Sequence, residues 1–266
     1  MMLKRKNLSA VLTLFLGAVV IGGLWPSPTT AQTPGTAFRD CPECPEMVVV
    51  PAGSFQMGDL SGGGDSDEKP MHQVTIPRPF AAGKYEVTQA EWEAVMGSNP
   101  SRFKGARNPV ERVSWNDALE FARKLSAKTG KQYRLLSEAE WEYVARANTN
   151  TKWFCGSNES CVGSVAWYGS NSGGETHPVG QKSANGFGIY DLHGNVWEWT
   201  EDCYHDSYNG APTNGSAWTS GGDCRRRVLR GGSWYYILRN LRAANRNGLT
   251  STYRSNRFGF RVAQTF

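Results

Sequence analysis

The sequence lacks the residues from which soft-metal and histidine-based metal sites are built. No cysteine follows Cys224, no second C-x-x-C motif accompanies Cys41–Cys44, and only four histidines occur in the chain. Zinc and copper(I) need clustered thiolate or imidazole ligands. None of the histidines shows metal-ligand spacing with another, and we expect His177 and His193 to lie in loops and bond backbone carbonyls. A histidine-based iron site is therefore not predicted.

A large excess of charge of either sign is also missing. The chain has 29 Lys+Arg and 24 Asp+Glu, for a net charge of +5. Removal of residues 1–31 would take away Lys4, Arg5 and Lys6 and no acid, which leaves 26 − 24 = +2. That balance is too small to indicate nucleic acid as a partner.

The first 31 residues have the features of a secretory signal peptide. A basic stretch, Lys4–Lys6, precedes an apolar, uncharged run from Leu8 to Leu24, and small residues would allow cleavage after Ala31. The alternative is an uncleaved membrane anchor, for which the run is short and is broken by glycine and proline. We favour cleavage and a secreted, periplasmic or cell-envelope location, with no membrane association after cleavage.

The six cysteines all lie in the exported part, which suits an oxidising compartment. Cys41-x-x-Cys44 could be a redox pair or half of a zinc site, but no second motif and no βαβ pattern support either. We therefore favour structural disulfides for each of three pairs: Cys41 with Cys44, Cys155 with Cys161, and Cys203 with Cys224.

Composition predicts a leader, a short linker and one domain. Residues 32–45 are rich in proline, threonine and glycine and carry the C-x-x-C motif, so they are expected to form a linker. Residues 46–266 can bury one large core, and 30 glycines with ten tryptophans indicate a turn-rich α+β fold. Strands are predicted at 47–55 and 72–76, with an exposed loop at 58–69.

Three short helices each begin with a capping box. Thr88 with Glu91, Ser114 with Asp117, and Ser137 with Glu140 precede apolar residues at helical spacing. Gly97 and Gly130 stand where C-terminal caps would be. Trp115-Asn116-Asp117 is similar to a sugar-binding triplet of C-type lectins, but Asp117 is better explained as a capping-box acid. Beyond residue 148 the sequence predicts short strands and long ordered loops.

One run, Asn185–Thr200, combines three glycines with aromatic residues, Asp191 and Glu198. Together with other segments along the chain it resembles the formylglycine-generating enzyme family, also called the sulfatase-modifying-factor domain. The resemblance implies a variant of the C-type-lectin fold, with helices on short strands and much irregular structure. The other segments that carry it are 49–58, 84–92, 134–146, 229–234 and 257–262.

The resemblance also implies a structural calcium ion. Its ligands would be the carboxylates of Asp191 and Glu198 and the backbone carbonyls of Gly194 and Val196. Hard oxygen donors of this kind suit Ca²⁺. The alternative is that the two carboxylates only accept hydrogen bonds from nearby backbone groups.

Members of the family that generate formylglycine bind copper(I) through two cysteines after the Gly-Gly-Ser motif. Counted from Ser233, the corresponding places hold Tyr236 and Leu241. Thiolates are what copper(I) requires, so copper is not expected, and the resemblance alone does not make the chain an enzyme. This pattern favours a family member without the oxidase chemistry.

The family groove for an extended peptide would be lined by Ser233 and its neighbours. Trp234 is expected in the core, whereas Tyr235 and Tyr236 are equally compatible with core and groove. The first hypothesis is a secreted binding or accessory module for a peptide, protein or glycan. The alternative is an oxidoreductase of the sulfatase-maturation type, or a related protein-modifying enzyme, with Ser233, Tyr235, Tyr236 or Arg246 at a different active site.

Overall fold

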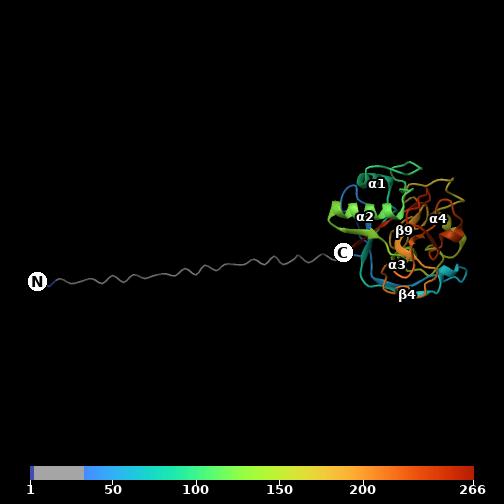
Figure 1. The fold of residues 1–266 in the computed structure, drawn as a ribbon, viewed down its shortest axis with the longest axis horizontal. Coiled ribbons are helices and arrows are strands. Elements are labelled where there is room, and N and C mark those ends of the chain that lie inside the picture. Colours follow the sequence, from blue (N-terminus) through green and yellow to red (C-terminus); the bar gives the residue numbers. More distant parts are fainter. Residues whose placement is uncertain (3–32) are drawn as a thin grey trace. The chain divides into compact units, whose positions relative to one another are not determined.

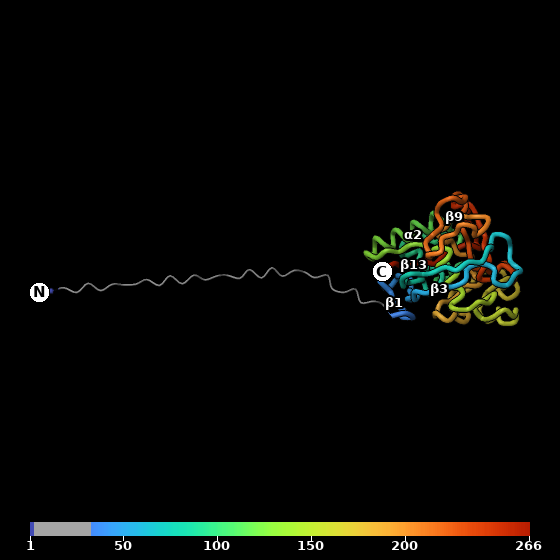
Figure 2. Tube along the Cα trace, turned by 90° about the horizontal axis from the view of Figure 1, so that it is seen from below, coloured from blue at the N-terminus to red at the C-terminus, as the bar shows by residue number. Residues whose placement is uncertain are grey.

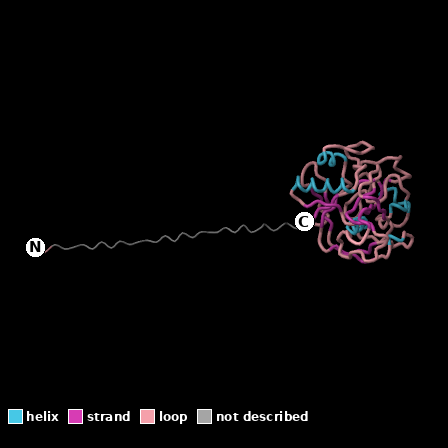
Figure 3. The backbone as a smooth tube through the Cα atoms, in the orientation of Figure 1, coloured by secondary structure: helices cyan, strands magenta, loops and turns pink. Residues whose placement is uncertain are grey.

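The computed structural model describes residues 1–2 and 33–266. The predicted signal peptide, residues 1–31, lies almost entirely outside the described part. From residue 33 onward the chain forms one unit in which short strands occupy the centre and helices lie around them (Figures 1 and 3). Within the described residues, no helix has both the length and the apolar character needed to cross a membrane.

A five-stranded sheet brings together distant parts of the chain. Its order is β1-β2-β5-β13-β6, so the strand nearest the C-terminus lies between two strands from much earlier in the sequence. Figure 2 shows β1, β13 and the C-terminus on the same side of the domain. The neighbouring strands are antiparallel throughout. The bounds are β1 (Ala37–Phe38), β2 (Met47–Val50), β5 (Phe80–Gly83), β13 (Val262–Thr265) and β6 (Gln132–Leu135).

The segment expected to be a linker is instead part of this sheet. β1 pairs with β2, and the Gly35 N–H donates to the carbonyl of Val49 at 2.8 Å. Cys41 and Cys44 form a disulfide, and Cys44 is fully buried. The proline, threonine and glycine content of residues 32–45 therefore produces tight turns at a sheet edge and not a free tether.

The second sheet has the order β11-β10-β9-β12 and contains the two longest strands. β12 runs parallel to β9, while β9, β10 and β11 form antiparallel pairs. Two small two-stranded sheets complete the fold, β3 with β4 and β7 with β8. The bounds are β9 (Trp197–Tyr204), β10 (Asp223–Arg230), β11 (Arg246–Thr250), β12 (Phe258–Gly259), β3 (Gly53–Met57), β4 (His72–Ile76), β7 (Ala166–Trp167) and β8 (His193–Gly194).

The three predicted helices are confirmed, each with its capping box. Gly97 and Gly130 adopt the left-handed conformation at the ends of the first two, as glycine allows without steric cost. Asp117 accepts a hydrogen bond from the Ser114 N–H at 2.8 Å, so its capping role is also confirmed. The helices are α1 (Gln89–Met96), α2 (Trp115–Thr129), α3 (Glu138–Arg146), the single turn α4 (Val162–Val165), and the 3₁₀ turns η1 (Ser66–Glu68), η2 (Glu159–Cys161) and η3 (Leu238–Leu241).

Two large apolar clusters form the core. In the first, α2 contributes Phe121 and Leu125, which lie with Trp92, Trp197 and Phe260. Trp92 stacks on Phe121 with ring centroids 5.6 Å apart, and Phe260 meets Phe121 edge-on. Burial of large aromatic side chains contributes much of the hydrophobic free energy of a domain this rich in loops. The second cluster packs α3 against β2, β4 and β5.

Helix α3 is also held by charge in the interior. Glu142 is bound by Arg146, with an Nη2–Oε1 distance of 2.7 Å, and by Arg230. Glu138 pairs with Arg246, with an Nε–Oε1 distance of 2.6 Å, and lies 3.3 Å from Arg230. Burial opposes ionisation of Glu138, yet the two arginines lower its pKa below the ordinary value. Together these five side chains connect α3 to β10 and β11.

We predict that Glu142→Gln strongly destabilises the domain. The substitution leaves the buried Arg146 without its anion and removes one of the two carboxylates paired with Arg230, and breaking a buried pair typically costs about 3–5 kcal/mol. Urea unfolding with the disulfides intact measures the loss of free energy. Glu120→Gln, which breaks an exposed pair with Arg123 on α2, serves as the control and should change little. Equal unfolding midpoints for the two variants would contradict the prediction.

Candidate functional site

The run Asn185–Thr200 forms an irregular turn that leads into β9. Asp191 and Asn195 have φ angles of 59° and 53°, in the left-handed region that Asp and Asn tolerate better than most residues. Gly194 has a φ of 93°, and a Cβ added to it would lie 2.1 Å from the Trp167 carbonyl oxygen. The close backbone approach of β7 and β8 therefore requires glycine at this position.

This turn places the carboxylates of Asp191 and Glu198 in the interior of the domain. Glu198, on β9, accepts two hydrogen bonds from Arg261, from Nη2 to Oε1 and from Nε to Oε2, both at 2.6 Å. The same carboxylate accepts from Trp141 Nε1 at 2.8 Å. Asp191 accepts from the Gly180 N–H at 2.7 Å through Oδ2 alone.

A third acid, Glu86, faces the same centre. It accepts from the Val196 N–H at 3.0 Å and from Asn195 Nδ2 at 2.7 Å. Burial raises the pKa of Glu86 well above its ordinary value, and the charges of Asp191 and Glu198 add to the effect. Burial also raises the pKa of Asp191 to about 6.

Three buried carboxylates therefore lie around Arg261, which pairs with Glu198 and acts on Glu86 and Asp191 through its charge, while Arg107 also acts on Asp191. Because an uncompensated buried charge is costly, the centre requires additional positive charge, supplied by protons or by a cation. The structure brings together Asp191 and Glu198 as the sequence suggested, but both oxygens of Glu198 already accept from Arg261 and Trp141. We call Glu86, Asp191, Glu198 and Arg261 the carboxylate centre.

Sequence reasoning missed an acidic group elsewhere. Asp65, Asp67 and Glu68 place one carboxylate oxygen each within 4.8 Å of one another and could together hold a metal ion such as calcium. Their spacing, Asp-x-Asp-Glu in the loop at 58–69, was the available signal. Two of the three already pair with arginine: Arg242 Nη2 lies 2.6 Å from Glu68, and Arg239 Nη2 lies 2.5 Å from Asp65.

The segment after Gly232 turns part of its aromatic side chains outward. Tyr235 is 60% exposed and Ile237 is 67% exposed, while Tyr236 is half-buried. Trp234 is buried, as expected, and its Nε1 donates to the Asn256 carbonyl at 2.9 Å. Ser233 is fully buried, so the expectation that its side chain lines a groove is wrong.

Arg246 does not belong to this surface. It lies on β11, where it donates to Glu138 and to the backbone carbonyls of Asp67 and His205. The sequence analysis named it as a candidate together with Ser233, Tyr235 and Tyr236. The sharp turn through η3 and the pairing of β11 with β10 instead carry it into the buried ion-pair network.

The places counted for a thiolate pair, Tyr236 and Leu241, pack against one apolar cluster. Leu241 is 0% exposed and lies with Trp153 and Val165. The Cys155–Cys161 disulfide packs on the same cluster. All six cysteines of the sequence are paired in disulfides, in the three combinations that their spacing favoured.

The histidines bond the backbone, as the sequence indicated for two of them. His193 is fully buried, its Nδ1 lies 2.7 Å from the Leu241 carbonyl, and Phe154 N–H donates to its Nε2 at 3.3 Å. Burial lowers the pKa of His193 to about 4, so the ring is neutral at physiological pH. His177 Nε2 lies 2.7 Å from the Ser172 carbonyl. These rings are therefore occupied by structural hydrogen bonds.

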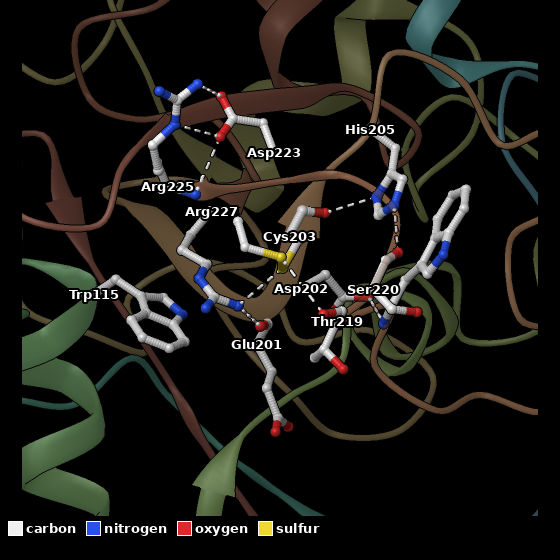
Figure 4. Close-up of a disulfide and its surroundings, with 12 residues drawn as sticks. Trp115, Glu201, Asp202, Cys203, His205, Thr219, Ser220, Asp223, Arg225 and Arg227 are labelled. Carbon is white, nitrogen blue, oxygen red and sulfur yellow. Dashed lines mark hydrogen bonds and ion pairs between the residues drawn. A yellow bond between two sulfur atoms is a disulfide. The ribbon is translucent and has the colours of Figure 1, made fainter.

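The Cys203–Cys224 disulfide joins β9 to β10 (Figure 4). The residues next to the two cysteines, Tyr204 and Asp223, line a hollow of about 340 Å³. His205 lines the hollow and stacks on Trp218, with ring centroids 3.4 Å apart. Both ring nitrogens of His205 lie 3.0 Å from backbone carbonyls. On the other side of the disulfide, Arg227 lies over the Trp115 ring at 3.9 Å. These contacts hold the loop between Cys203 and Cys224 in place.

Comparison with known proteins extends over the whole described domain. Residues 33–266 match the family model of the sulfatase-modifying factor enzyme 1-like domain. The chain is 32% identical to the chaperone protein LppX of Paenibacillus barcinonensis, over 83% of this chain and 87% of that protein. It is 31% identical to the formylglycine-generating enzyme of Streptomyces coelicolor, over 90% and 95% respectively.

A solved structure shares the fold closely. The structure of PvdO from Pseudomonas aeruginosa superposes with a TM-score of 0.82 and 42% sequence identity, covering 89% of this chain and all of the other. The expected α+β fold, with few helices, short strands and irregular loops, is thereby confirmed.

We predict that, in metal-free protein, Asp191→Asn removes the loss of unfolding free energy that ionisation of Asp191 causes at high pH. The native pKa of Asp191, about 6, exceeds its ordinary 3.8, so its stabilising contribution is complete below pH 3.8 and is lost as the pH rises through 6. The difference corresponds to about 3 kcal/mol. Asparagine accommodates the left-handed φ and can still accept from Gly180.

Urea unfolding in chelator at pH 4 and pH 8 measures this effect. The variant should equal the wild type at pH 4 and exceed it at pH 8. Asp223→Asn, which alters a surface acid paired with Arg225, is the matched control and should keep the wild-type pH dependence. A parallel loss of stability in wild type and Asp191→Asn would contradict the prediction.

Proposed function

Because the chain belongs to the sulfatase-modifying factor enzyme 1-like domain family, we propose that it is a binding or accessory module of that family without copper-dependent oxidation of cysteine. Its ligand would be a peptide, a protein or a glycan. The observation that carries the proposal is the state of the cysteines, since all six are paired in disulfides. Copper(I) requires free thiolates.

The surroundings of Tyr236 and Leu241 support the proposal. An apolar, fully buried leucine stands where a copper thiolate would be needed, and its neighbours are aliphatic and aromatic. A cysteine oxidase would need a polar, accessible centre at this place. The exposed Tyr235 and Ile237 instead supply the apolar surface that a binding site uses.

The relatives are compatible with both binding and catalysis. One is named a chaperone, which is a binding function, and covers most of this chain. Another is named a formylglycine-generating enzyme at similar identity, and this favours a second candidate: oxidation or modification of a protein through other residues. In that case the Tyr236 hydroxyl, 3.4 Å from Arg257 Nη1, and the exposed Tyr235 are polar groups that could take part.

We also propose that Ca²⁺ stabilises the domain through Asp191, Glu198 and the carbonyls of Gly194 and Val196. Support comes from the carboxylate centre, where three buried acids lie close together and burial raises the pKa of Glu86 and Asp191. A hard divalent cation would supply the missing positive charge. Its role would be structural, because the centre is buried.

The disulfides agree with a location outside the cytoplasm. Three pairs in the described residues are typical of an extracellular or cell-envelope protein, where an oxidising environment maintains them. Export by cleavage of residues 1–31 is the route that we propose.

The first experiment tests for oxidase chemistry. The purified, disulfide-bonded protein is incubated with copper(I), oxygen and a cysteine-containing sulfatase-type peptide, and the peptide is analysed by mass spectrometry. We expect no aldehyde and no stoichiometric copper. The Streptomyces coelicolor relative serves as the positive control. Copper-dependent aldehyde formation would refute the proposal, and aldehyde without copper would favour the second candidate.

The calcium proposal predicts a shift in thermal stability. Calcium added to chelated wild-type protein at pH 8 should raise the unfolding midpoint, because a ligand that binds only the native state stabilises it by mass action. Asp191→Asn should lose most of that shift. Asp65→Asn, in the acidic group on the other loop, separates the two places. An unchanged midpoint with calcium in the wild type would exclude calcium binding.

A further inference from the structure

We propose that a surface formed by Arg102, Phe103, Tyr235, Tyr236 and Arg257 binds an acidic, extended peptide segment. We call it the aromatic–arginine strip. The inference rests on the proposed binding function and specifies the ligand. It starts from two arginines that lack carboxylate partners and from tyrosines that face solvent.

The strip is continuous through ring contacts. Phe103 meets the buried Trp234 edge-on, with centroids 5.3 Å apart. Trp234 meets Tyr235 at 5.5 Å, and Tyr235 meets Tyr236 at 5.7 Å, again edge-on. Tyr236 rests in turn on the buried Trp197 at 5.6 Å. The strip is therefore anchored to the first core cluster, and it can present its outer atoms without rearrangement.

Two guanidinium groups extend the strip. The Cζ of Arg257 lies 5.2 Å from the Tyr235 ring and 5.6 Å from the Tyr236 ring. The Cζ of Arg102 lies 5.4 Å from the ring of Phe103. These distances are within the range of cation–π attraction, which orients the guanidinium planes without consuming their charge.

Neither arginine forms an ion pair within the described residues. Arg257 bonds only neutral oxygens, at 3.3 Å to Ser255 Oγ and 3.4 Å to the Tyr236 hydroxyl. By contrast Arg254, three residues earlier, is neutralised by Asp117 with an Nε–Oδ2 distance of 2.7 Å. Glu111 is fully buried and accepts from the backbone N–H groups of Arg102 and Phe103, not from the Arg102 guanidinium. The positive charge of the strip is thus available to a ligand.

These features favour an acidic peptide over a glycan. Sugars stack on open ring faces, but the tyrosine rings meet each other edge-on and Arg257 lies over both. Guanidinium groups bind carboxylates through paired, charge-assisted hydrogen bonds, and the exposed Ile237 and Tyr253 offer apolar contacts beside them. An extended segment with alternating acidic and aromatic side chains would match both components.

The test measures binding of labelled peptides by fluorescence anisotropy. The probe is a peptide of alternating Glu and Tyr, compared with matched peptides that carry Gln or Lys in place of Glu. The Glu peptide should bind most tightly, and its affinity should fall as salt is added. Arg257→Gln should weaken it by about tenfold, the effect of one charge-assisted hydrogen bond. Arg257→Lys should retain part of the affinity.

Two controls separate binding from folding. Arg78→Gln alters an exposed arginine between β4 and β5, outside the strip, and it should leave the affinity unchanged. Tyr235→Ala removes an exposed ring and should weaken binding without lowering the unfolding midpoint.

Equal affinity for the Glu and Gln peptides would overturn the acidic preference but leave the binding function intact. Binding of a neutral oligosaccharide and of none of the peptides would replace the inference with a glycan site. Aldehyde formation on a cysteine peptide would instead refute the proposed function, whatever the result with acidic peptides.

Discussion

Paired charge in the interior is the constraint on which the arrangement of this domain depends. Helix α3 carries Glu138 and Glu142 into the space between the sheets, and Arg230 and Arg246 meet them from β10 and β11. A buried carboxylate without its guanidinium would be far less stable, so α3 can adopt only positions that keep both pairs. Apolar packing alone tolerates small shifts of a helix, whereas these directional contacts fix its rotation and depth.

The need to pair buried charges also explains why the carboxylate centre differs from the ion-pair network of α3. The α3 network supplies three guanidinium groups for two carboxylates, and the pKa of Glu138 is lowered. In the carboxylate centre only Glu198 forms an ion pair, with Arg261, and the pKa values of Glu86 and Asp191 are raised although Arg107 also acts on Asp191. In the α3 network the carboxylates are fully paired with arginines. The carboxylate centre has more negative than positive charge, which is the property expected of a site that binds a proton or a cation.

Local features of the sequence were predictable, and contacts between distant segments were not. The capping boxes of α1, α2 and α3 depend on residues three positions apart, so the sequence contains all the partners. Glu86 was not recognised at the carboxylate centre because its partner, the Val196 N–H, lies 110 residues away. Arg246 was misplaced for the same reason, since its fate depends on β11 pairing with β10. The segment at 32–45 has the composition of a linker, but only its pairing with β2 shows that it belongs to the sheet.

The position of β13 has a consequence for the timing of folding. β2, β5 and β6 are complete within the first 135 residues, yet β5 and β6 are joined only by β13, at Val262–Thr265. A chain that emerges from its amino end first exposes two unpaired strand edges until that final strand arrives. The sheet can therefore close only after nearly the whole domain is available to fold. Until then the exposed edges of β5 and β6 can pair with the wrong strands. A factor that covers these edges would have to bind the protein before it has folded.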